Sequence, residues 1–417
     1  MHFFGADLDF GCFFTPFFYV WGVKKKYLLR ILILAFACGL FYLFFTRLNL
    51  PAQVEPLTGD ACKEVPDKSL SYAKNFGVNR CGNFRVIWVK NGMAEPLRWV
   101  LKDSLSGNSI PQNLHAYPEL KIPAQKLAIF SSTYLGFLTT LGVENRVAVI
   151  DAKKYIANPE FYARVDSLHI REVGEGMELS PEAVYESQVD MIFAFSMGAS
   201  IHDVFPKLAR LKMPVVLTSE WTESSPLAKA EWLKFFGILV GKEALADSIF
   251  EEKAARYKEV RTFIDSLLQN EKRPVVITGT PSSGTWFASP GKSFMANLIH
   301  EAGGRYLWES DTSEASFSMP FEKAFADAQM AEVWINPGAA KDLREILDRD
   351  PRVERLPLWK TGEIYEYDLR KGPEGGIDFY ESAVVKPDSL LLDVAKMLHP
   401  TYFKSIVSKW YRKLSNI

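Results

Sequence analysis

The amino-acid sequence predicts an α/β fold: two Rossmann-like α/β lobes joined by one long helix, with an N-terminal membrane segment and a small N-terminal β-containing extension. The lobes are predicted because short apolar runs, typical of buried parallel strands, alternate with helical segments on both sides of residues 242–269. That middle stretch contains no Gly or Pro. Its apolar residues recur at helical spacing: Leu245, Ile249, Tyr257, Val260, Ile264 and Leu268. A chain of 417 residues is long enough for two domains with separate cores.

Residues 1–50 are predicted to be a signal peptide or a membrane anchor. Three lysines (24–26) and Arg30 precede an apolar run over residues 31–45, and this order is typical of both. Cys38 follows Ala-Phe-Ala, which resembles a bacterial lipoprotein cleavage box, although the residues after Cys38 stay apolar, as in an uncleaved anchor. In either case the positive charge keeps this end in the cytoplasm. The rest of the chain is then expected on the periplasmic or extracytoplasmic face of a bacterial membrane.

Residues 51–125 form the predicted N-terminal extension. The segment NFRVIWVKN (83–91) has the alternating pattern of a strand. Cys62 and Cys81 are the two cysteines beyond the anchor. In an exported protein they could form a disulfide, and two separate thiols are equally compatible with the spacing. The chain has no CxxC motif and its six His are scattered, so we expect no structural zinc site.

Neither composition nor motifs indicate a nucleic-acid or nucleotide partner. Hydrophobic residues make up 48% of the chain, charged residues 24%, and the net charge is −1, as in an ordinary globular protein. A nucleic-acid partner would favour a basic stripe. The GKS at 291–293 lacks the upstream Gly of a phosphate-binding loop, and GTPSSG (279–284) is followed by Thr285 where Lys is needed.

The first lobe is predicted over residues 126–240. KLAIFSS is a strand entering a polar turn, and STYLGFLTTLG is a helix ending at Gly142. VAVID (147–151) is the next strand. A helix opening at Ser180-Pro181 leads to the buried strand MIFAF (191–195), DVFPKLARLK is a further helix, and PVVLT (214–218) a further strand.

The linking helix is predicted within residues 241–271, the second lobe over 272–400 and a C-terminal tail over 401–417. PVVITGT (274–280) is a strand, SFMANLIHEAGG a helix, and EVWIN (332–336) the next strand. DLREILDR is a helix and EIYEYD (363–368) the last strand of the lobe.

Two glutamates occupy matched positions in the two lobes. Glu182 follows Pro181 at one helix start, and Glu322 follows Pro320 at another. In each case a short helix, an acidic residue (Asp190 or Glu332) and a buried strand come next. A Glu in a first helical turn can simply complement the helix dipole. Two in equivalent positions suggest a shared use.

The chain resembles the substrate-binding proteins of ABC importers for iron-siderophores, haem and cobalamin, over roughly residues 126–400. The resemblance is carried by IPAQKLAIFSST, SPEAVYESQVDMIFAF, and EWTESSPLAKAEWLKFFGILVGKE with the long helix, then by SSGTWFASPGKSFMANLIHEAGGRYLW, AEVWIN and FYESAVVKPDSLLLDVAKMLHP. It implies a stiff helical hinge with a ligand cleft between the lobes. It also implies that Glu182 and Glu322 dock onto an ABC permease dimer with its ATPase subunits. No catalytic residue, cofactor or resident metal is expected.

The cleft wall is predicted from the rule that ligands of open α/β sheets sit beyond the carboxyl ends of the strands. Hydroxyls would orient a ligand, and Trp and Tyr would offer flat apolar faces to a large ring system or metal chelate. The residues that follow strands of the first lobe are Ser131, Ser132, Thr133, Ser196, Met197, Glu220 and Trp221. Those of the second lobe are Ser283, Thr285, Trp286, Asn336 and Tyr380.

Two other functions are compatible with parts of the sequence. AFSMG (194–198) resembles a nucleophile elbow with Ser196 as the nucleophile of a membrane-anchored serine hydrolase, although an HGG-type oxyanion segment is missing. A binding module that senses its ligand for another partner would share every feature of the importer component except the permease.

Overall fold

The computed structural model describes residues 62–92, 95–103, 106, 110–175, 178–195, 207–208, 211–313 and 317–415. The predicted anchor, the ligand residues Ser196 and Met197, and most of the helix predicted at 203–212 lie outside these residues. No helix in the described part of the chain is long and apolar enough to cross a membrane.

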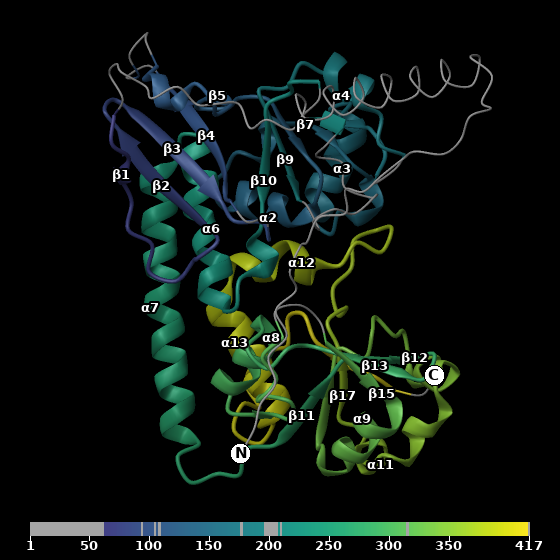
Figure 1. Cartoon of the computed structure of the whole chain (residues 1–417). Coiled ribbons are helices and arrows are strands. Elements are labelled where there is room, and N and C mark those ends of the chain that lie inside the picture. Colours follow the sequence, from purple (N-terminus) through teal and green to yellow (C-terminus); the bar gives the residue numbers. More distant parts are fainter. Residues whose placement is uncertain are drawn as a thin grey trace, which may run out of the picture. The chain divides into compact units, whose positions relative to one another are not determined.

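The first lobe is built on a five-stranded parallel sheet in the order β10-β9-β6-β7-β8 (Figure 1). Its strands are β6 (Leu127–Ile129), β7 (Val147–Ile150), β8 (Arg171–Glu172), β9 (Met191–Phe195) and β10 (Val215–Thr218). The helices around it are α2 (Ser132–Thr140), α3 (Pro159–Ser167), α4 (Pro181–Glu186) and α6 (Pro226–Leu239). The strand and helix predictions for this lobe are confirmed wherever its residues are described, and β8, α3 and α6 were not predicted. β8 has two residues, both exposed, so it has no apolar signal.

The N-terminal extension is a second sheet, in the order β1-β2-β3-β4-β5, with β5 parallel to β4 and the other pairs antiparallel. Its strands are β1 (Val65–Pro66), β2 (Phe76–Cys81), β3 (Phe84–Val89), β4 (Leu97–Lys102) and β5 (Glu119–Lys121). β3 confirms the strand predicted at 83–91. A disulfide joins Cys62 to Cys81 across 5.4 Å between their Cα atoms, so of the two alternatives for these thiols the structure has the bonded one.

The extension packs as part of the first lobe. Phe76, Ile87 and Trp99 join the core that β6 and β9 share, and the Trp99 indole donates a hydrogen bond of 3.0 Å to the carbonyl of Val215. Val215 lies in β10, at the edge of the parallel sheet. The extension therefore covers an edge strand that would otherwise offer unpaired backbone groups.

The linking helix is α7 (Glu243–Leu267), which runs alongside both lobes in Figure 1. Its buried side chains are Ala246, Phe250, Ala254, Tyr257 and Ile264. The sequence placed Leu245 and Ile249 at the start of the buried stripe. That prediction was wrong for Leu245, which is exposed, because the buried face begins one residue later at Ala246.

The second lobe has a sheet in the order β14-β11-β16-β17-β18, parallel except for the last pair. Its strands are β11 (Val275–Thr278), β14 (Arg305–Tyr306), β16 (Val333–Ile335), β17 (Ile364–Glu366) and β18 (Arg412–Lys413). A small antiparallel sheet consists of β12 (Thr280–Ser282), β13 (Thr285–Ala288) and β15 (Phe317–Pro320). The helices are α8 (Phe294–Glu301), α9 (Phe321–Asp327), α10 (Leu343–Arg349), α11 (Pro357–Thr361), α12 (Asp378–Ser382) and α13 (Pro387–Leu398).

Short 3₁₀ turns complete the described elements: η1 (Gln112–Leu114), η2 (Glu144–Arg146), η3 (Lys153–Tyr155), η5 (Glu220–Thr222), η6 (Ala328–Met330), η7 (Pro351–Arg355) and η8 (Ala383–Val385).

The C-terminal tail belongs to the second lobe's core. Trp410 is fully buried, and the Asp393 carboxylate accepts the backbone N–H groups of Lys409 and Trp410 at 3.0 and 2.8 Å. The segment 363–368 was predicted to supply the last strand, and this was wrong because β18 follows it. A two-residue strand that pairs only through its backbone gives no periodicity to detect.

Candidate ligand-binding site between the lobes

The lobes meet where α12 of the second lobe lies against α2 of the first. Gly136 in α2 makes this approach possible, because a Cβ there would lie 1.8 Å from the backbone oxygen of Glu381. The Glu381 side chain then crosses to the first lobe, where its buried carboxylate accepts the backbone N–H groups of Ala157 and Asn158 at 2.8 and 3.0 Å. Burial raises the pKa of Glu381 to about 7.

A loop before α12 makes a second contact between the lobes. Gly372 and Gly376 fit against the backbone of the first lobe, where an added Cβ would lie 2.1 Å from the Ile156 oxygen and 2.4 Å from the Tyr155 oxygen. At the tip of the loop, the Tyr162 hydroxyl donates a hydrogen bond to the Glu374 carboxylate. Small residues in the loop therefore set the spacing of the two lobes.

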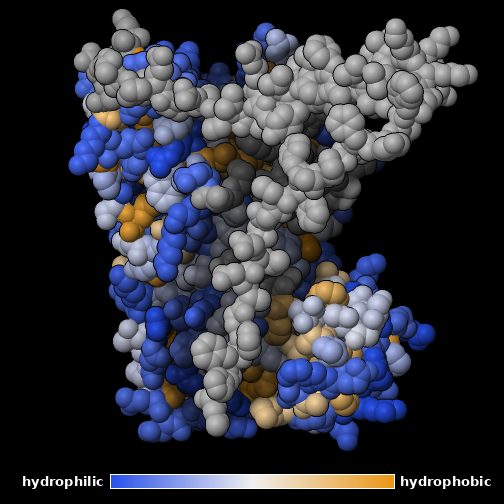
Figure 2. Space-filling view, in the orientation of Figure 1, coloured by the Kyte–Doolittle hydropathy of each residue, from blue (hydrophilic) through white to orange (hydrophobic). Residues whose placement is uncertain are grey.

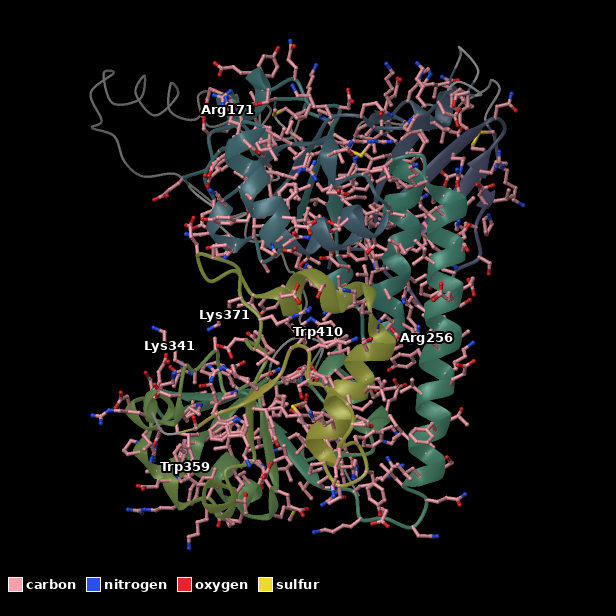
Figure 3. The ribbon with its side chains drawn as sticks, turned by 180° about the vertical axis from the view of Figure 1, so that it is seen from behind. Arg171, Arg256, Lys341, Trp359, Lys371 and Trp410 are labelled. Atoms are coloured by element: carbon pink, nitrogen blue, oxygen red, sulfur yellow. A yellow bond between two sulfur atoms is a disulfide. The ribbon has the colours of Figure 1, made fainter. Side chains whose placement is uncertain are left out.

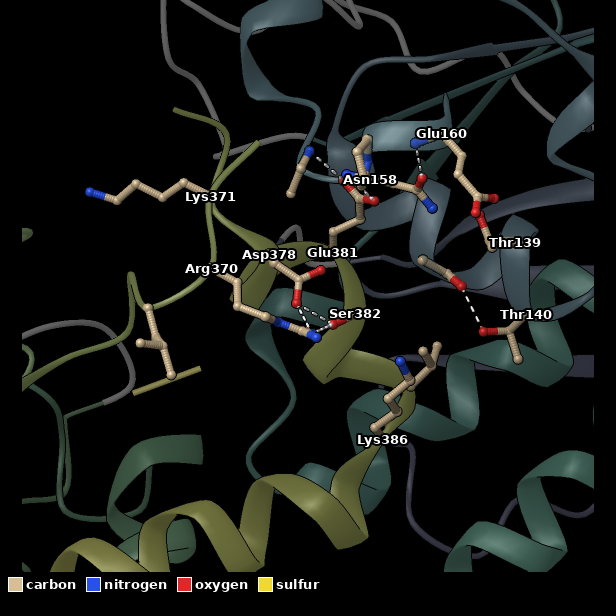
Figure 4. Close-up of a pocket in the computed structure, with 15 residues that line it drawn as sticks. Thr139, Thr140, Asn158, Glu160, Arg370, Lys371, Asp378, Glu381, Ser382 and Lys386 are labelled. Atoms are coloured by element: carbon tan, nitrogen blue, oxygen red, sulfur yellow. Dashed lines mark hydrogen bonds and ion pairs between the residues drawn. The ribbon is translucent and has the colours of Figure 1, made fainter. Parts of the chain in front are cut away.

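A cavity of about 650 Å³ lies beside these contacts (Figure 4). The first lobe contributes Gly136, Thr139, Thr140 and residues 157–160 to its wall, and the second contributes residues 369–371, 378, 381, 382, 385 and 386. None of the ligand residues predicted from the sequence lines this cavity. The strand-end rule missed it because much of its wall comes from α2 and from α12, and eleven residues separate α12 from the end of β17.

The predicted ligand residues of the first lobe lie at strand ends. Ser131 is the N-cap of α2, with its hydroxyl accepting the Thr133 N–H at 3.3 Å, and Ser132 and Thr133 are half-buried beside it. After β10, Glu220 is buried, which raises the pKa of its carboxyl, whereas Trp221 is 48% exposed. Trp221 therefore offers a ligand an exposed aromatic face, whereas the Glu220 carboxyl group is not accessible to a ligand.

A buried polar cluster next to Glu220 was not predicted. The Thr218 hydroxyl donates to the Tyr134 hydroxyl at 2.9 Å. Burial lowers the pKa of Lys229, on α6, to about 8, and the negative charge of Glu220 acts in the opposite direction. The Lys229 Nζ lies 4.2 Å from the ring centre of Phe294 in the second lobe. The available signal was the charged residues Lys229, Glu231 and Lys234 in a helix that is otherwise apolar.

The predicted ligand residues of the second lobe divide into accessible and buried groups. Ser283 is exposed, Thr285 is half-buried in β13, and Asn336 is half-buried in a left-handed conformation (φ 58°) directly after β16. Tyr380 is 46% exposed, and its hydroxyl donates to the Tyr367 hydroxyl at 2.6 Å.

Trp286 does not lie on a cleft wall. Its indole is fully buried, donates to the Thr278 carbonyl at 3.0 Å and packs 5.0 Å from the Trp334 ring centre. The sequence placed it on the wall because it follows the strand VVITGT. The alternation of β13 instead turns Trp286 inward and its neighbour Phe287 outward.

The two matched glutamates are both exposed but differ in their partners. Among the described residues, Glu182 has one polar side-chain partner, the Ser180 hydroxyl, at 3.4 Å. The Glu322 carboxylate pairs with the Arg352 guanidinium at 2.8 Å, and Arg352 also forks onto Asp350 and lies over the Phe321 ring. The Glu322 backbone N–H and then Arg352 lower the pKa of the Glu322 carboxyl.

The acidic residues that follow these helices have equivalent structural roles. Asp190 accepts the N–H groups of Gln125 and Lys126, each at 2.8 Å, before β6. Glu332 accepts the N–H of Val275 at 3.2 Å at the start of β11. The matched pattern in the sequence thus corresponds to a repeated helix–acid–strand unit in the two lobes.

A family model described as periplasmic binding protein matches residues 127–370, and the chain belongs to this family. An uncharacterized lipoprotein of Methanocaldococcus jannaschii is 21% identical over 306 residues, covering 70% of each chain. A solved periplasmic heme binding protein from Pseudomonas aeruginosa is 15% identical with a TM-score of 0.53, covering 70% of this chain and 99% of that one. The triscatecholate siderophore binding protein FeuA from Bacillus subtilis, complexed with ferri-bacillibactin, is 18% identical with a TM-score of 0.50, covering 68% and 95%.

Family membership defines the class of protein. The chain is a solute-binding protein and not an enzyme, which removes the serine hydrolase centred on Ser196 as an alternative. Its binding lobes are extracytoplasmic. The structural similarities establish the fold, and the ligands named for the two solved proteins belong to those proteins.

Proposed function

We propose that the protein is the substrate-binding component of an ABC importer, which captures an iron-siderophore, haem or cobalamin-type ligand between its lobes and delivers it to a permease. The observation that carries the proposal is the pair of parallel-sheet lobes that α7 links and that meet through α2 and α12. Ligand sites in proteins are commonly concave regions between domains. The haem and the iron chelate bound by the two structural relatives favour a bulky metal-containing ligand.

The residues proposed to bind the ligand are those of the predicted wall that remain accessible. Trp221 and Tyr380 provide exposed aromatic faces, one from each lobe. Hydroxyl and amide groups from both lobes would orient the ligand: Ser131, Ser132, Thr133, Ser283, Thr285 and Asn336. Ser196, Met197 and Glu220 remain sequence-based assignments, and Trp286 is withdrawn because it is buried.

An aromatic substitution tests this site. Trp221→Ala should weaken binding of whichever chelate binds by at least about tenfold, because burial of a large aromatic side chain contributes roughly 1.5–3 kcal/mol. Tyr402→Ala is the matched control, since Tyr402 is 44% exposed in the C-terminal tail and belongs to no proposed site. Equal affinities for the two variants would remove Trp221 from the site.

Delivery is proposed to use Glu182 and Glu322, which stand exposed in the first turns of α4 and α9. The double variant Glu182→Ala with Glu322→Ala should keep the wild-type affinity for ligand and lose uptake in cells, because charge complementarity acts on docking. Lys at both positions should be worse than Ala, since it adds repulsion. Glu252→Ala, at an exposed position of α7, is the control. Normal uptake by the double variant would leave both glutamates as ordinary helix-start residues.

The membrane attachment is proposed to come from residues 1–50, as a lipid-modified or uncleaved anchor. The lipoprotein relative supports such an attachment. A protein without residues 1–50, exported with a cleavable signal, should be released into the soluble extracytoplasmic fraction.

A further inference from the structure

The turn that carries Trp221 is held by the N-terminal extension. This turn, η5, joins the end of β10 to the start of α6. The side-chain amide of Asn75 donates a hydrogen bond of 2.8 Å to the Thr222 hydroxyl, and that hydroxyl donates in turn to the Ser219 carbonyl at 2.7 Å. Asn75 comes directly before β2, and Ser219 is the N-cap of η5. The two bonds therefore connect the extension to both ends of the turn.

A buried carboxylate makes a second attachment. Glu223, the residue after the turn, is 3% exposed, and its carboxylate accepts the backbone N–H groups of Lys74 and Asn75, each at 3.0 Å. The Trp232 indole of α6 donates to the same oxygen at 3.1 Å. The extension thus binds both residues that follow Trp221 in the sequence.

The Trp221 side chain has no such attachment of its own. Within the part of the chain that the structure describes, its indole makes no hydrogen bond and no contact with another ring or a cation. Because the side chain is also 48% exposed, its direction depends on the backbone of η5. Fixing that backbone preorganises the aromatic face, and a preorganised group loses less entropy when a ligand binds.

The same segment also contacts the second lobe. The carbonyl of Ser224 accepts a hydrogen bond of 2.7 Å from the side-chain amide of Asn297, on α8. Figures 1 and 3 view the molecule from opposite sides, and in both the extension lies alongside α6 and α7. The residues around η5 are therefore held by the extension on one side and reach the second lobe on the other.

We infer that Asn75 is a positioning residue for ligand binding: through Thr222 and Glu223, the N-terminal extension sets the direction of the Trp221 indole. The extension lies outside residues 127–370, which match the family model, so family membership assigns it no role in binding. The role of Asn75 rests on the proposed contact between Trp221 and the ligand.

The first test needs no ligand. In protein labelled with fluorotryptophan, the fluorine NMR resonance that disappears in Trp221→Phe reports on this side chain. Asn75→Ala should shift or broaden that resonance and leave the resonance of the buried Trp286 unchanged. Asn79→Ala is the matched control, because Asn79 also lies in the extension and donates one side-chain hydrogen bond, of 2.9 Å, to Glu64. A Trp221 resonance that is the same in Asn75→Ala and wild type would overturn the inference.

The second test measures affinity, with haemin, a ferric tris-catecholate siderophore and cyanocobalamin as probes. For a probe that binds, Asn75→Ala should weaken binding by about two- to tenfold, the range that the net contribution of one hydrogen bond gives. Thr222→Val should reproduce this loss, because it removes the other partner of the bond, and Asn79→Ala should not. In the Trp221→Ala background, Asn75→Ala should have no further effect, since both substitutions act through the same indole.

The outcomes separate the role of Asn75 from the proposed function. Equal losses of affinity from Asn75→Ala with and without Trp221 would show that Asn75 acts through another contact, and would overturn the inference. If no probe binds, or if Trp221→Ala binds as wild type does, the proposed ligand site fails. The fluorine resonance then still decides whether Asn75 positions Trp221.

Discussion

Removing the carboxylate of Glu231 should weaken the packing of the N-terminal extension against the first lobe. Glu231, on α6, is fully buried, and its two oxygens accept the backbone N–H groups of Ser71, Tyr72 and Ala73 at 2.9, 2.8 and 2.8 Å. Lys234 is a further donor at 3.3 Å. The segment that these bonds hold leads directly into β2.

The magnitude follows from the number and kind of bonds. Hydrogen bonds to a charged group contribute about 1.5–3 kcal/mol each, but three neighbouring bonds are not additive, and residues 71–73 can regain water because they are not buried. Loss of one partner of a buried ionic group costs about 3–5 kcal/mol. We therefore expect Glu231→Ala to lower the free energy of unfolding by about 3–5 kcal/mol.

The assay is denaturant unfolding together with hydrogen exchange. In Glu231→Ala the amides of residues 71–73 should exchange faster, while those of β11 and β16 in the second lobe should keep their protection. Glu243→Ala is the control: that carboxylate is 36% exposed and pairs with Lys68 and Arg85, so its loss should cost no more than about 1 kcal/mol. A stability within about 0.5 kcal/mol of wild type for Glu231→Ala would refute this account of how the extension is held.

Further predictions concern the contact between the lobes and the exposed aromatic residues. Gly136→Ala should lower stability by about 2–4 kcal/mol, because the added Cβ meets backbone and not a flexible side chain; thermal unfolding measures this, and an unchanged midpoint would contradict it. The folded-state pKa of Glu381, about 7, lies above its unfolded value, so its stabilising contribution is complete below about pH 4.5 and is lost as pH rises through 7. Stability curves of wild type and Glu381→Gln should therefore diverge by about 3 kcal/mol across that interval, and parallel curves would be evidence against it. Iodide should quench the fluorescence of Trp221 but not that of Trp286, so Trp221→Phe should reduce the quenchable fraction, whereas Trp286→Phe should leave it unchanged.

The fold could be predicted more fully than the site because hydrophobic residues mark the buried strands. On the face shown in Figure 2 the described surface is mostly hydrophilic, with hydrophobic residues gathered over the second lobe. Buried strands such as Met191–Phe195 are continuous apolar runs, and Ser180 and Ser293 cap the helices that the sequence indicated. These signals are local, so the order of strands and helices could be predicted from the sequence.

The interlobe contacts have no local signal. Glu381 reaches Ala157 across 224 positions, and Gly136 matters only because α12 lies against it. Arg352 pairs with Glu322 from thirty residues away, which no helix-start pattern indicates. Trp286 was misplaced because it belongs to a separate short strand, β13, whose alternation turns it toward the core, whereas the sequence placed it in the turn after VVITGT.

The central claim is that the two lobes form one binding site for a bulky metal-containing ligand. The most direct test is native mass spectrometry of the purified extracytoplasmic part with a panel of ferric siderophores, haem and cobalamin, supported by titration of Trp fluorescence. The account predicts a saturable one-to-one complex with at least one member of the panel, weakened by Trp221→Ala and unchanged by the Glu182→Ala and Glu322→Ala double variant. A folded protein that binds none of them, or whose binding survives Trp221→Ala at full affinity, would contradict it.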